Sequence, residues 1–313
     1  MVKLVDDLYQ SLPSSVNFIT DLNEMLSPFS SKKESRGSHY ISVGKNVLHE
    51  KVAENVFKAA SLHSGKHLLC KVFPISRYAQ SLAVYSHLPV QPNLRHPSEI
   101  ILGHSIAYVF FEHTYGNMYK HVLSSQGLCE DEALMLFHQI VSVVAHCHNN
   151  GVVLRRLKLK NFAFKNEERT QLALCTLKDA YIIEKDDFVS GKHSCPVYIS
   201  PESLQPESSF SGRASNVWTL GVMLYTILVG RHPFTHSNLN GLYTKIQKCK
   251  FNLPELLSPK AKCLICSILR LDPSERLTAE EILSHPWFSS TNYSQYMWRK
   301  MFYNEEDQKV PSL

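Results

Sequence analysis

A short stretch of this chain gathers cationic side chains and one amide that could together bind an anionic group. The cations are Arg155, Arg156, Lys158 and Lys160, joined further along the chain by Lys178. A guanidinium keeps its proton at physiological pH, so Arg156 cannot accept a proton as a general base. The amide of Asn161 could bind a metal ion, but no carboxylate lies beside it in the stretch 154–161. The stretch therefore favours either a solvated basic surface or a site for an acidic or phosphorylated partner segment.

The same stretch resembles the catalytic loop of a protein kinase in its spacing. That loop reads H-R-D-L-K-x-x-N, in which the Asp is the catalytic base and the Asn holds a metal ion. Here Leu154, Arg155 and Arg156 stand at the H-R-D positions, and Asn161 stands at the position of the Asn. The frame is retained, but the base has been replaced by a cation.

Four further segments match the protein-kinase pattern in the same order. They are "LLCKVF" with Lys71 at the phosphate-binding lysine, "CPVYISPE" ending at Glu202, "NVWTLG" from Asn216, and "PSERLTAEEILSHPWF" with Arg276. An Arg at the last position pairs with the Glu of A-P-E in kinases, so we expect a structural Glu202–Arg276 ion pair. The ordered matches predict an α+β, two-lobed protein-kinase-like fold with a small β-rich N-terminal lobe and a large helical C-terminal lobe.

The parts that would hold nucleotide phosphates are missing. If Val56 is the Val of G-x-G-x-x-G-x-V, the three glycine positions are occupied by His49, Lys51 and Glu54. Side chains there would block the close backbone approach that glycines allow. No acidic residue lies between Lys71 and Glu99, so the sequence offers Lys71 no obvious carboxylate partner. Lys71 is therefore expected to be a vestige of a nucleotide pocket.

The magnesium-binding D-F-G is also replaced. Thr176, Leu177 and Lys178 follow "TQLALC" in its register. A rival register remains open, in which Asp179 begins a D-F-G-like triplet after a longer hairpin. Because the base, the glycines, the helix carboxylate and the metal carboxylate are all missing, we expect no catalytic residue, no metal site and no productive binding of ATP with magnesium.

Composition narrows the class of protein. The chain has 313 residues and a mild net charge of +5, which does not indicate a nucleic-acid-binding protein. It has no apolar run of about 20 residues and its N-terminus lacks the pattern of a secretory signal, so no membrane span or secretion is expected. The eight scattered cysteines suggest reduced thiols in the cytosol or nucleus. Cys263 and Cys266 are expected to be buried packing residues, and His146 and His148 to be packing or capping residues rather than metal ligands.

Three regions are expected. Residues 1–39 form a Ser-rich flexible segment, 40–288 the kinase-like domain, and 289–313 a polar tail. Short β-like runs fill 40–112, and helical periodicity begins at 130. The residues predicted to face the core of that first long helix are Leu134, Phe137, Ile140, Val141, Val144 and Ala145. The stretch 217–230 is apolar on every face and predicts a buried helix.

At this level of detail the chain resembles the Tribbles pseudokinases. The likeness covers about 40–313 and rests on "LCKVFPI", "LKLKNFAF", "KHSCPVYISPE", "VWTLGVMLYTILVGRHPF" and "PSERLTAEEILSHPWF", among others. Family members also lack the glycine loop and commonly carry S-L-E in place of D-F-G, where this chain has residues 176–178. These three residues would gate substrate docking, and Lys178 reverses the charge of the family's acid. Vertebrate members mostly keep the catalytic-loop Asp, so Arg156 indicates an invertebrate-type member.

The resemblance also implies two binding segments near the C-terminus. The family ends in a peptide that docks on the propeller domain of a constitutive-photomorphogenesis-type RING ubiquitin ligase, and "EEDQKVPSL" supplies its core with Asp307, Gln308, Lys309, Val310 and Pro311. The other segment binds MAP kinase kinases in the family. Its matching residues are Ile282, Leu283, His285, Pro286, Trp287 and Phe288. Because "HPWF" also closes ordinary kinase domains as core packing, both roles stay open for this second segment.

The resemblance thus implies a non-catalytic adaptor. The large lobe would capture a degron, from C/EBP-type transcription factors in the family, and the tail would recruit the ligase so that the substrate is degraded. MAP kinase kinases and Akt-type kinases are the other expected partners, and the nucleus and cytoplasm the expected locations. Two alternatives remain: a kinase-inhibiting scaffold without a ubiquitin role, and a weakly active atypical Ser/Thr kinase that uses Asp179 for metal.

Overall fold

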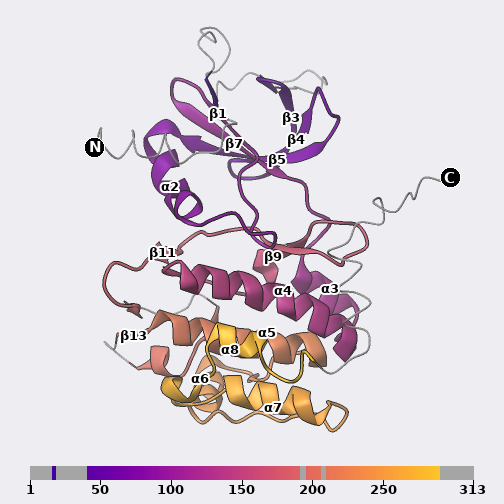
Figure 1. Ribbon diagram of the computed structural model, residues 1–313, viewed down its shortest axis with the longest axis vertical. Coiled ribbons are helices and arrows are strands. Elements are labelled where there is room, and N and C mark those ends of the chain that lie inside the picture. The colour runs from indigo at the N-terminus through magenta and orange to yellow at the C-terminus, as the bar shows by residue number, and fades with distance from the viewer. Residues whose placement is uncertain (1–15, 19–40, 191–194, 206–208, 290–313) are drawn as a thin grey trace, which may run out of the picture. The chain divides into compact units, whose positions relative to one another are not determined.

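The structure is a computed structural model that describes residues 41–190, 195–205 and 209–289, together with the backbone of 16–18. The chain divides into two compact units, Met1–Thr114 and Tyr115–Leu313. The first unit is β-rich and the second mainly helical, as expected of a two-lobed kinase-like fold (Figure 1). The predicted tail, 289–313, lies outside the described residues except for Ser289.

The first unit is a seven-stranded sheet in the order β1-β6-β7-β5-β4-β3-β2. Its strands are β1 (Val16–Phe18), β2 (Ile41–Val43), β3 (Asn46–Ala53), β4 (Val56–Ser61), β5 (His67–Pro74), β6 (Glu99–Leu102) and β7 (Ile106–Glu112). Only the β1–β6 pair is parallel. β1 falls within the segment 1–39, of which the structure describes nothing else.

A tight turn joins β3 to β4 at the place of the glycine loop. Asn55 takes a left-handed backbone conformation there, with φ of 57°. Asparagine tolerates this region better than most residues, which lets the two strands pair without a glycine. The helix α2 (Ile75–His87) follows β5 directly and contacts β5 and β7 (Figure 1).

The second unit is built on helices that pack against one another. They are α3 (Met118–Ser124), α4 (Glu130–Asn149), α5 (Gly212–Val229), α6 (Leu239–Gln247), α7 (Pro259–Ile268) and α8 (Ala279–Leu283). α5 and α8 lie beside α4, and α7 packs on α5 (Figure 1). All six residues predicted for the buried face of α4 are indeed buried. The predicted apolar helix is α5, whose side chains are buried from Asn216 to Leu228.

Short two-stranded ladders and 3₁₀ turns connect these helices. The antiparallel pairs join β8 (Val152–Val153) with β11 (Tyr181–Ile182), β9 (Phe162–Phe164) with β10 (Leu172–Leu174), and β12 (Phe188–Val189) with β13 (Phe210–Ser211). The 3₁₀ turns are Leu159–Asn161, Pro196–Tyr198, Glu202–Leu204 and Pro273–Glu275. The degenerate catalytic loop, 154–161, follows β8 and ends with the first of these 3₁₀ turns.

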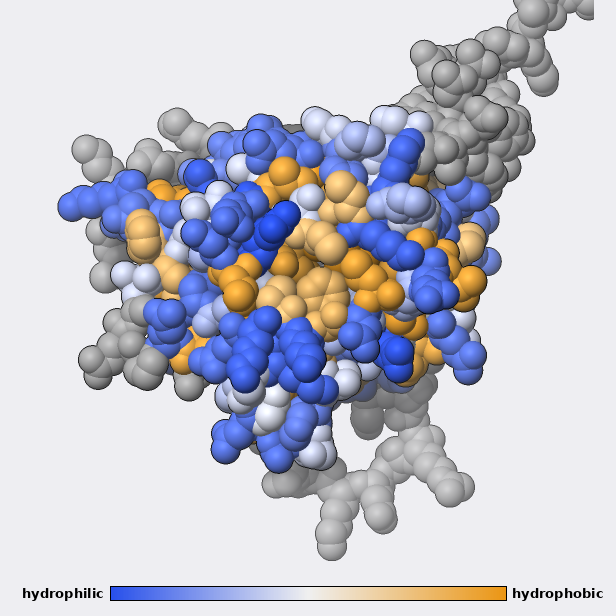
Figure 2. Space-filling model, turned by 90° about the horizontal axis from the view of Figure 1, so that it is seen from below, coloured by the Kyte–Doolittle hydropathy of each residue, from blue (hydrophilic) through white to orange (hydrophobic). Residues whose placement is uncertain are grey.

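Polar side chains cover most of the molecular face shown in Figure 2, where they surround an apolar area. Among the described residues of the second unit, the exposed large apolar side chains include Leu239, Leu256 and Leu271. No helix of the described residues is long and apolar enough to cross a membrane.

Candidate functional site

The backbone at the start of the degenerate catalytic loop is held by a buried amide from α5. Asn216 donates from Nδ2 to the Leu154 carbonyl at 2.6 Å, and its Oδ1 accepts from the Leu154 backbone N–H at 3.0 Å. Because the Asn216 amide both donates to Leu154 and accepts from it, the orientation of the amide is fixed. Asn216 stands at the first position of the expected D-x-W-x-x-G frame, and its role is to fasten the loop to the core.

His148, at the end of α4, completes this buried network. Its Nε2 lies 3.1 Å from Asn216 Oδ1, which is an acceptor, so the neutral ring carries its proton on Nε2. Burial lowers the pKa of His148 to about 4, and only the hydrogen bond to Asn216 and the Asp187 charge oppose the shift. The histidine is buried and hydrogen-bonded within this network, as expected of a packing residue.

The β9–β10 hairpin brings Asn161 next to residues 176–178. The Asn161 backbone N–H donates to the Lys158 carbonyl in the 3₁₀ turn, and the Cys175 N–H donates to the Asn161 carbonyl at 2.9 Å. Leu177 is buried, and the Thr176 hydroxyl accepts the Lys178 backbone N–H at 3.2 Å. The D-F-G position is therefore occupied by an apolar side chain between a hydroxyl and a cation.

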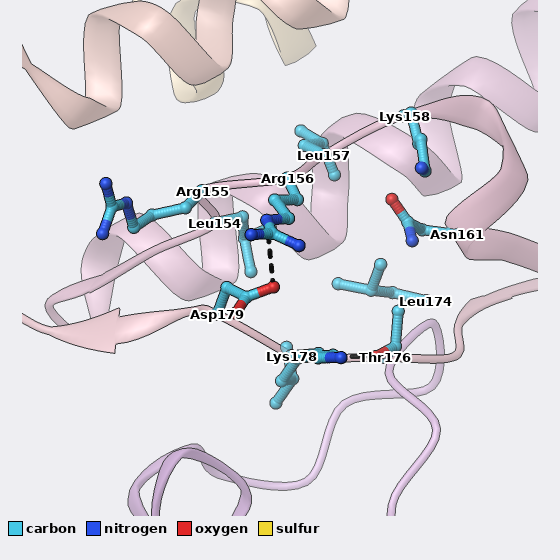
Figure 3. A pocket seen from close by; sticks show the side chains of 11 residues that line it. Leu154, Arg155, Arg156, Leu157, Lys158, Asn161, Leu174, Thr176, Lys178 and Asp179 are labelled. Atoms are coloured by element: carbon cyan, nitrogen blue, oxygen red, sulfur yellow. Dashed lines mark hydrogen bonds and ion pairs between the residues drawn. The ribbon is translucent and has the colours of Figure 1, made fainter. Parts of the chain in front are cut away.

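These segments enclose a cavity of about 170 Å³ that lies entirely within the second unit (Figure 3). The residues that line it are Leu154, Arg155, Arg156, Leu157, Lys158, Asn161, Leu174, Thr176, Leu177, Lys178 and Asp179. Four of these side chains are cationic and one is a carboxylate. The predicted degenerate residues, Arg156, Asn161 and Thr176, are thus brought together, whereas Lys160 is exposed and does not line the cavity.

An ion pair that sequence reasoning missed forms part of the lining of this cavity. Arg156 Nε lies 3.2 Å from Asp179 Oδ2 (Figure 3). Asp179 reaches this place from a left-handed backbone conformation with φ of 66°, which no periodicity in the sequence reveals. The carboxylate of the rival D-F-G register is therefore engaged by the residue that replaced the base. Within the described ranges, no group of three His, Cys, Asp or Glu side chains is arranged to hold a metal ion.

Lys71 has an aromatic neighbour, on which the expectation from the sequence was silent. It projects from β5, and its Nζ lies 4.8 Å from the centroid of the Phe111 ring on β7. A cation over an aromatic face is attracted by the ring quadrupole, and this attraction orients the lysine side chain. The expectation considered only acidic partners along the chain and could not see the strand pairing that brings Phe111 close.

The ion pair expected between Glu202 and Arg276 is present and bidentate. Arg276 Nη1 and Nη2 donate to the two carboxylate oxygens at 2.8 and 2.7 Å. The remaining N–H groups donate to the carbonyls of Ala214, Arg270 and Leu271. The arginine side chain is only 1% exposed, and its guanidinium lies 5.1 Å from the Trp218 ring. This fully satisfied cation joins the segment around Glu202 to α5 and to the turn before α8.

The segment 282–288 is largely core. Ile282 and Trp287 are 0% and 1% exposed, and Phe288 stacks on Phe137 of α4 with ring centroids 6.3 Å apart. Trp287 Nε1 donates to Glu130 Oε2 at 3.0 Å. Leu283 and His285 are half-buried, and Pro286 is exposed. Of the residues expected to bind a partner kinase, only these last three present surface to one.

Glu130 links the start of α4 to two other elements. Its carboxylate also accepts hydrogen bonds from the Ser258 backbone N–H and hydroxyl, each at 2.7 Å. Burial opposes ionisation, but the hydrogen bonds from Ser258 and Trp287 prevail and hold the pKa of Glu130 below its usual value. The carboxylate is a structural anchor for α7 and α8.

One expectation about cysteines was wrong. Cys263 is exposed and Cys266 half-buried, although both were expected to be buried. The core-facing side of α7 is formed by Ala261, Leu264, Ile265 and Ile268, and Cys263 points to the other side. The expected ligase-binding residues 307–311 lie outside the described residues.

Comparison with known proteins agrees with this geometry. The protein kinase domain family matches residues 52–288. Tribbles homolog 2 of the dog, Canis lupus familiaris, is 52% identical over 282 residues, which are 88% of this chain and 81% of that protein. The chain belongs to the Tribbles family. Tribbles homolog 1 of Homo sapiens is 50% identical over a stretch that covers 82% of this chain and 69% of that protein. Tribbles homolog 3 of Rattus norvegicus is 44% identical over 86% of this chain and 77% of that protein. The Tribbles-family fold is thus a protein kinase domain whose catalytic loop, in this chain, holds an Arg156–Asp179 ion pair.

Proposed function

We propose that this Tribbles-family chain is a non-catalytic adaptor that brings a substrate degron and a RING ubiquitin ligase together. Its large lobe captures the degron, which in the family comes from C/EBP-type transcription factors. Residues 307–311 bind the propeller domain of a constitutive-photomorphogenesis-type ligase. Holding both in one complex makes ubiquitin transfer effectively intramolecular and raises the effective concentration of the substrate. The result is proteasomal degradation of the bound factor.

The Arg156–Asp179 ion pair is the observation that carries the non-catalytic part of this proposal. Phosphoryl transfer requires a group that orients the attacking hydroxyl and a carboxylate that holds magnesium. Arg156 cannot serve as the first, and Asp179 is directed toward Arg156. Thr176 supplies no carboxylate in the usual register. We therefore propose no productive ATP or magnesium binding, and the same pair argues against the alternative of a weakly active kinase.

The adaptor part rests on the tail motif "DQKVP" behind a Tribbles-family domain. MAP kinase kinases and Akt-type kinases are proposed as further partners. Because Ile282, Trp287 and Phe288 are buried, such a kinase would contact the exposed and half-buried residues of 282–288. We propose the nucleus and cytoplasm as locations, with no direct binding to nucleic acid or membranes.

Calorimetry of the full chain against the propeller domain tests the adaptor proposal. Saturable binding is expected, and it should be lost when Val310→Ala and Pro311→Ala are combined. In cells, deletion of 305–313 should slow turnover of the degraded factor. Retained turnover after this deletion would contradict the adaptor proposal and favour the remaining alternative, a scaffold that inhibits kinases without ubiquitin chemistry.

The scaffold alternative has its own test. Trp287→Ala is unsuitable for pulldown of a partner kinase because it removes a core side chain. Pro286→Ala changes the exposed surface of the same segment and leaves the core intact. Loss of kinase capture by Pro286→Ala, with normal ligase binding, would assign kinase binding to this surface.

A further inference from the structure

The cavity around Arg156 has the side chains of an anion site. Arg156, Lys158, Lys178 and the amide of Asn161 lie around it, whereas the Arg155 guanidinium points away (Figure 3). Arg155 Nη2 donates to the Ser190 carbonyl at 2.7 Å and is thereby occupied. Leucines supply the apolar part of the lining, namely Leu154, Leu157, Leu174 and Leu177. Three cations and an amide beside an apolar wall suit a charged group carried on a short carbon chain.

Asp179 pairs with Arg156 at one edge of its guanidinium. The carboxylate contacts the guanidinium at Nε, and the terminal Nη1 and Nη2 make no hydrogen bond to any described residue. Those two nitrogens form the fork that binds two oxygens of a phosphate group at once. Lys158 and Lys178 have no carboxylate within ion-pair distance in the part of the chain that the structure describes. A dianion in the cavity would therefore face Lys158 and Lys178, which have no such partner, beside the paired Arg156.

Asn161 points to the kind of molecule that carries the anion. Its side-chain Oδ1 is buried and accepts no hydrogen bond from the described residues. A buried acceptor without a donor is unfavourable, so a ligand that donates an N–H there gains binding energy. A dianionic phosphate ester has no donor of its own, whereas a peptide carrying it has backbone N–H groups.

We propose that this cavity binds a phosphorylated serine or threonine of a partner protein. The phosphate lies against Arg156, Lys158 and Lys178, and a peptide N–H of the same segment donates to Asn161. The cavity volume of about 170 Å³ suits one phosphorylated side chain and is below the roughly 300–1,000 Å³ typical of sites for whole drug-sized ligands such as a nucleotide. This inference does not depend on the ligase-docking proposal, because residues 307–311 take no part in it.

The test titrates the full chain into N-acetyl-O-phosphoserine-N-methylamide at pH 8, where the phosphate is a dianion, and follows the ³¹P resonance. Saturable binding is expected. The double variant Lys158→Gln with Lys178→Gln should weaken binding by about tenfold or more, because it removes two charge-assisted contacts. The matched control combines Lys160→Gln with Lys185→Gln, which removes the same charge from exposed residues of the neighbouring segments outside the cavity. The control should bind within about twofold of the unmodified chain, since distant surface charges act weakly.

Three further probes separate the possible sources of the phosphate. Methyl phosphate should bind more weakly than the phosphoserine compound, and Asn161→Ala should abolish this difference. N-acetylserine-N-methylamide should not bind. Equal binding of methyl phosphate would overturn the assignment to a peptide, and tighter binding of metal-free ATP that depends on Lys158 and Lys178 would assign the cavity to a nucleotide instead. Absence of binding by the phosphoserine compound, or equal losses in the two double variants, would overturn the site.

Discussion

Arg276 shows how a single buried charge can be structural when every donor has an acceptor. Replacing it by alanine leaves Glu202 without its bidentate partner in a largely buried place. We predict that Arg276→Ala lowers the free energy of unfolding by about 3–5 kcal/mol, the usual cost of breaking a buried ion pair. Urea denaturation followed by tryptophan fluorescence measures it. The control Arg270→Ala removes an exposed guanidinium nearby and should change stability by no more than about 0.5 kcal/mol. A loss below about 1 kcal/mol for Arg276→Ala, on the order of a surface pair, would contradict this role.

His148 makes stability depend on pH. Its pKa is about 4 in the folded chain against the ordinary 6.5, so between these values the unfolded chain takes up a proton that the folded chain does not. The free energy of unfolding should therefore fall as the pH drops from 6.5 toward 4, by up to about 1.4 kcal/mol per pH unit from this residue. We predict that His148→Gln, measured by urea denaturation across this range, has a flatter pH dependence than the unmodified chain. Other histidines whose pKa is lowered by partial burial, such as His138 and His232, contribute equally to both proteins.

The exposed His63 gives the comparison for this prediction. His63→Gln removes one histidine without removing a buried ring, so a change of slope that both variants share would not come from burial. Identical slopes for His148→Gln and the unmodified chain would show that the buried network with Asn216 is not what limits stability in acid.

At the scale of elements, the short helix α8 is secured by the residues on its C-terminal side. A capping box formed by Thr278 and Glu281 begins the helix, and Trp287 and Phe288 then pack on α4. We predict that Trp287→Ala lowers the free energy of unfolding by about 3–5 kcal/mol, as for other large core side chains. Pro286→Ala, on the exposed side of the same turn, should cost less than about 0.5 kcal/mol. Comparable small effects of both changes in thermal or urea denaturation would mean that the segment is surface rather than core.

The end of α5 is fixed by a close approach that only glycine allows. Gly230 has φ of 75°, and a Cβ at that position would lie 2.5 Å from the Gln126 carbonyl group. Gly65 shares the left-handed conformation, with φ of 65°, but a Cβ there would meet nothing within 4 Å. We predict that Gly65→Ala costs about 1–2 kcal/mol for the backbone conformation alone. Gly230→Ala should cost clearly more in the same denaturation experiment, because the Gln126 backbone must also move. Equal losses of unfolding free energy for the two variants would show that the backbone at residue 126 can move away from an added Cβ without loss of stability.

For the molecule as a whole, the proposed lack of productive nucleotide binding predicts that ATP does not stabilise the folded chain. A ligand that binds the folded state at 100 times its Kd adds about 2.7 kcal/mol to stability. We predict that millimolar ATP with magnesium leaves the Tm of the full chain unchanged within about 1 °C, a small fraction of the shift such binding would cause. Differential scanning fluorimetry measures it. A rise in Tm that requires magnesium and disappears in Asp179→Asn would instead support a metal site in the rival register.

How far the sequence predicts this molecule depends on the range of the interactions. The two-lobed fold, the buried faces of α4 and α5 and the Glu202–Arg276 pairing follow from periodicity and from motif order, which are properties of the chain itself. The Arg156–Asp179 pair could not be predicted, because it depends on the left-handed backbone conformation of Asp179 in a stretch without helical or strand periodicity. The Lys71–Phe111 contact could not be predicted either, because it depends on the register in which β5 pairs with β7. The sequence "HPWF" alone is compatible with a core or a surface position. Its burial is decided by the packing of Trp287 and Phe288 on α4, which the sequence does not reveal.

The position of Asp179 has a consequence for any return of an aspartate to position 156 of this chain. An aspartate placed at 156, as in catalytic loops, would put a second carboxylate near that of Asp179 in place of the cation that now pairs with it, and like charges close together repel one another. Arg156→Asp alone would therefore exchange an attractive pair for a repulsive one instead of simply restoring a base. A second change, at position 179, would be needed to relieve the repulsion, so the two positions depend on one another.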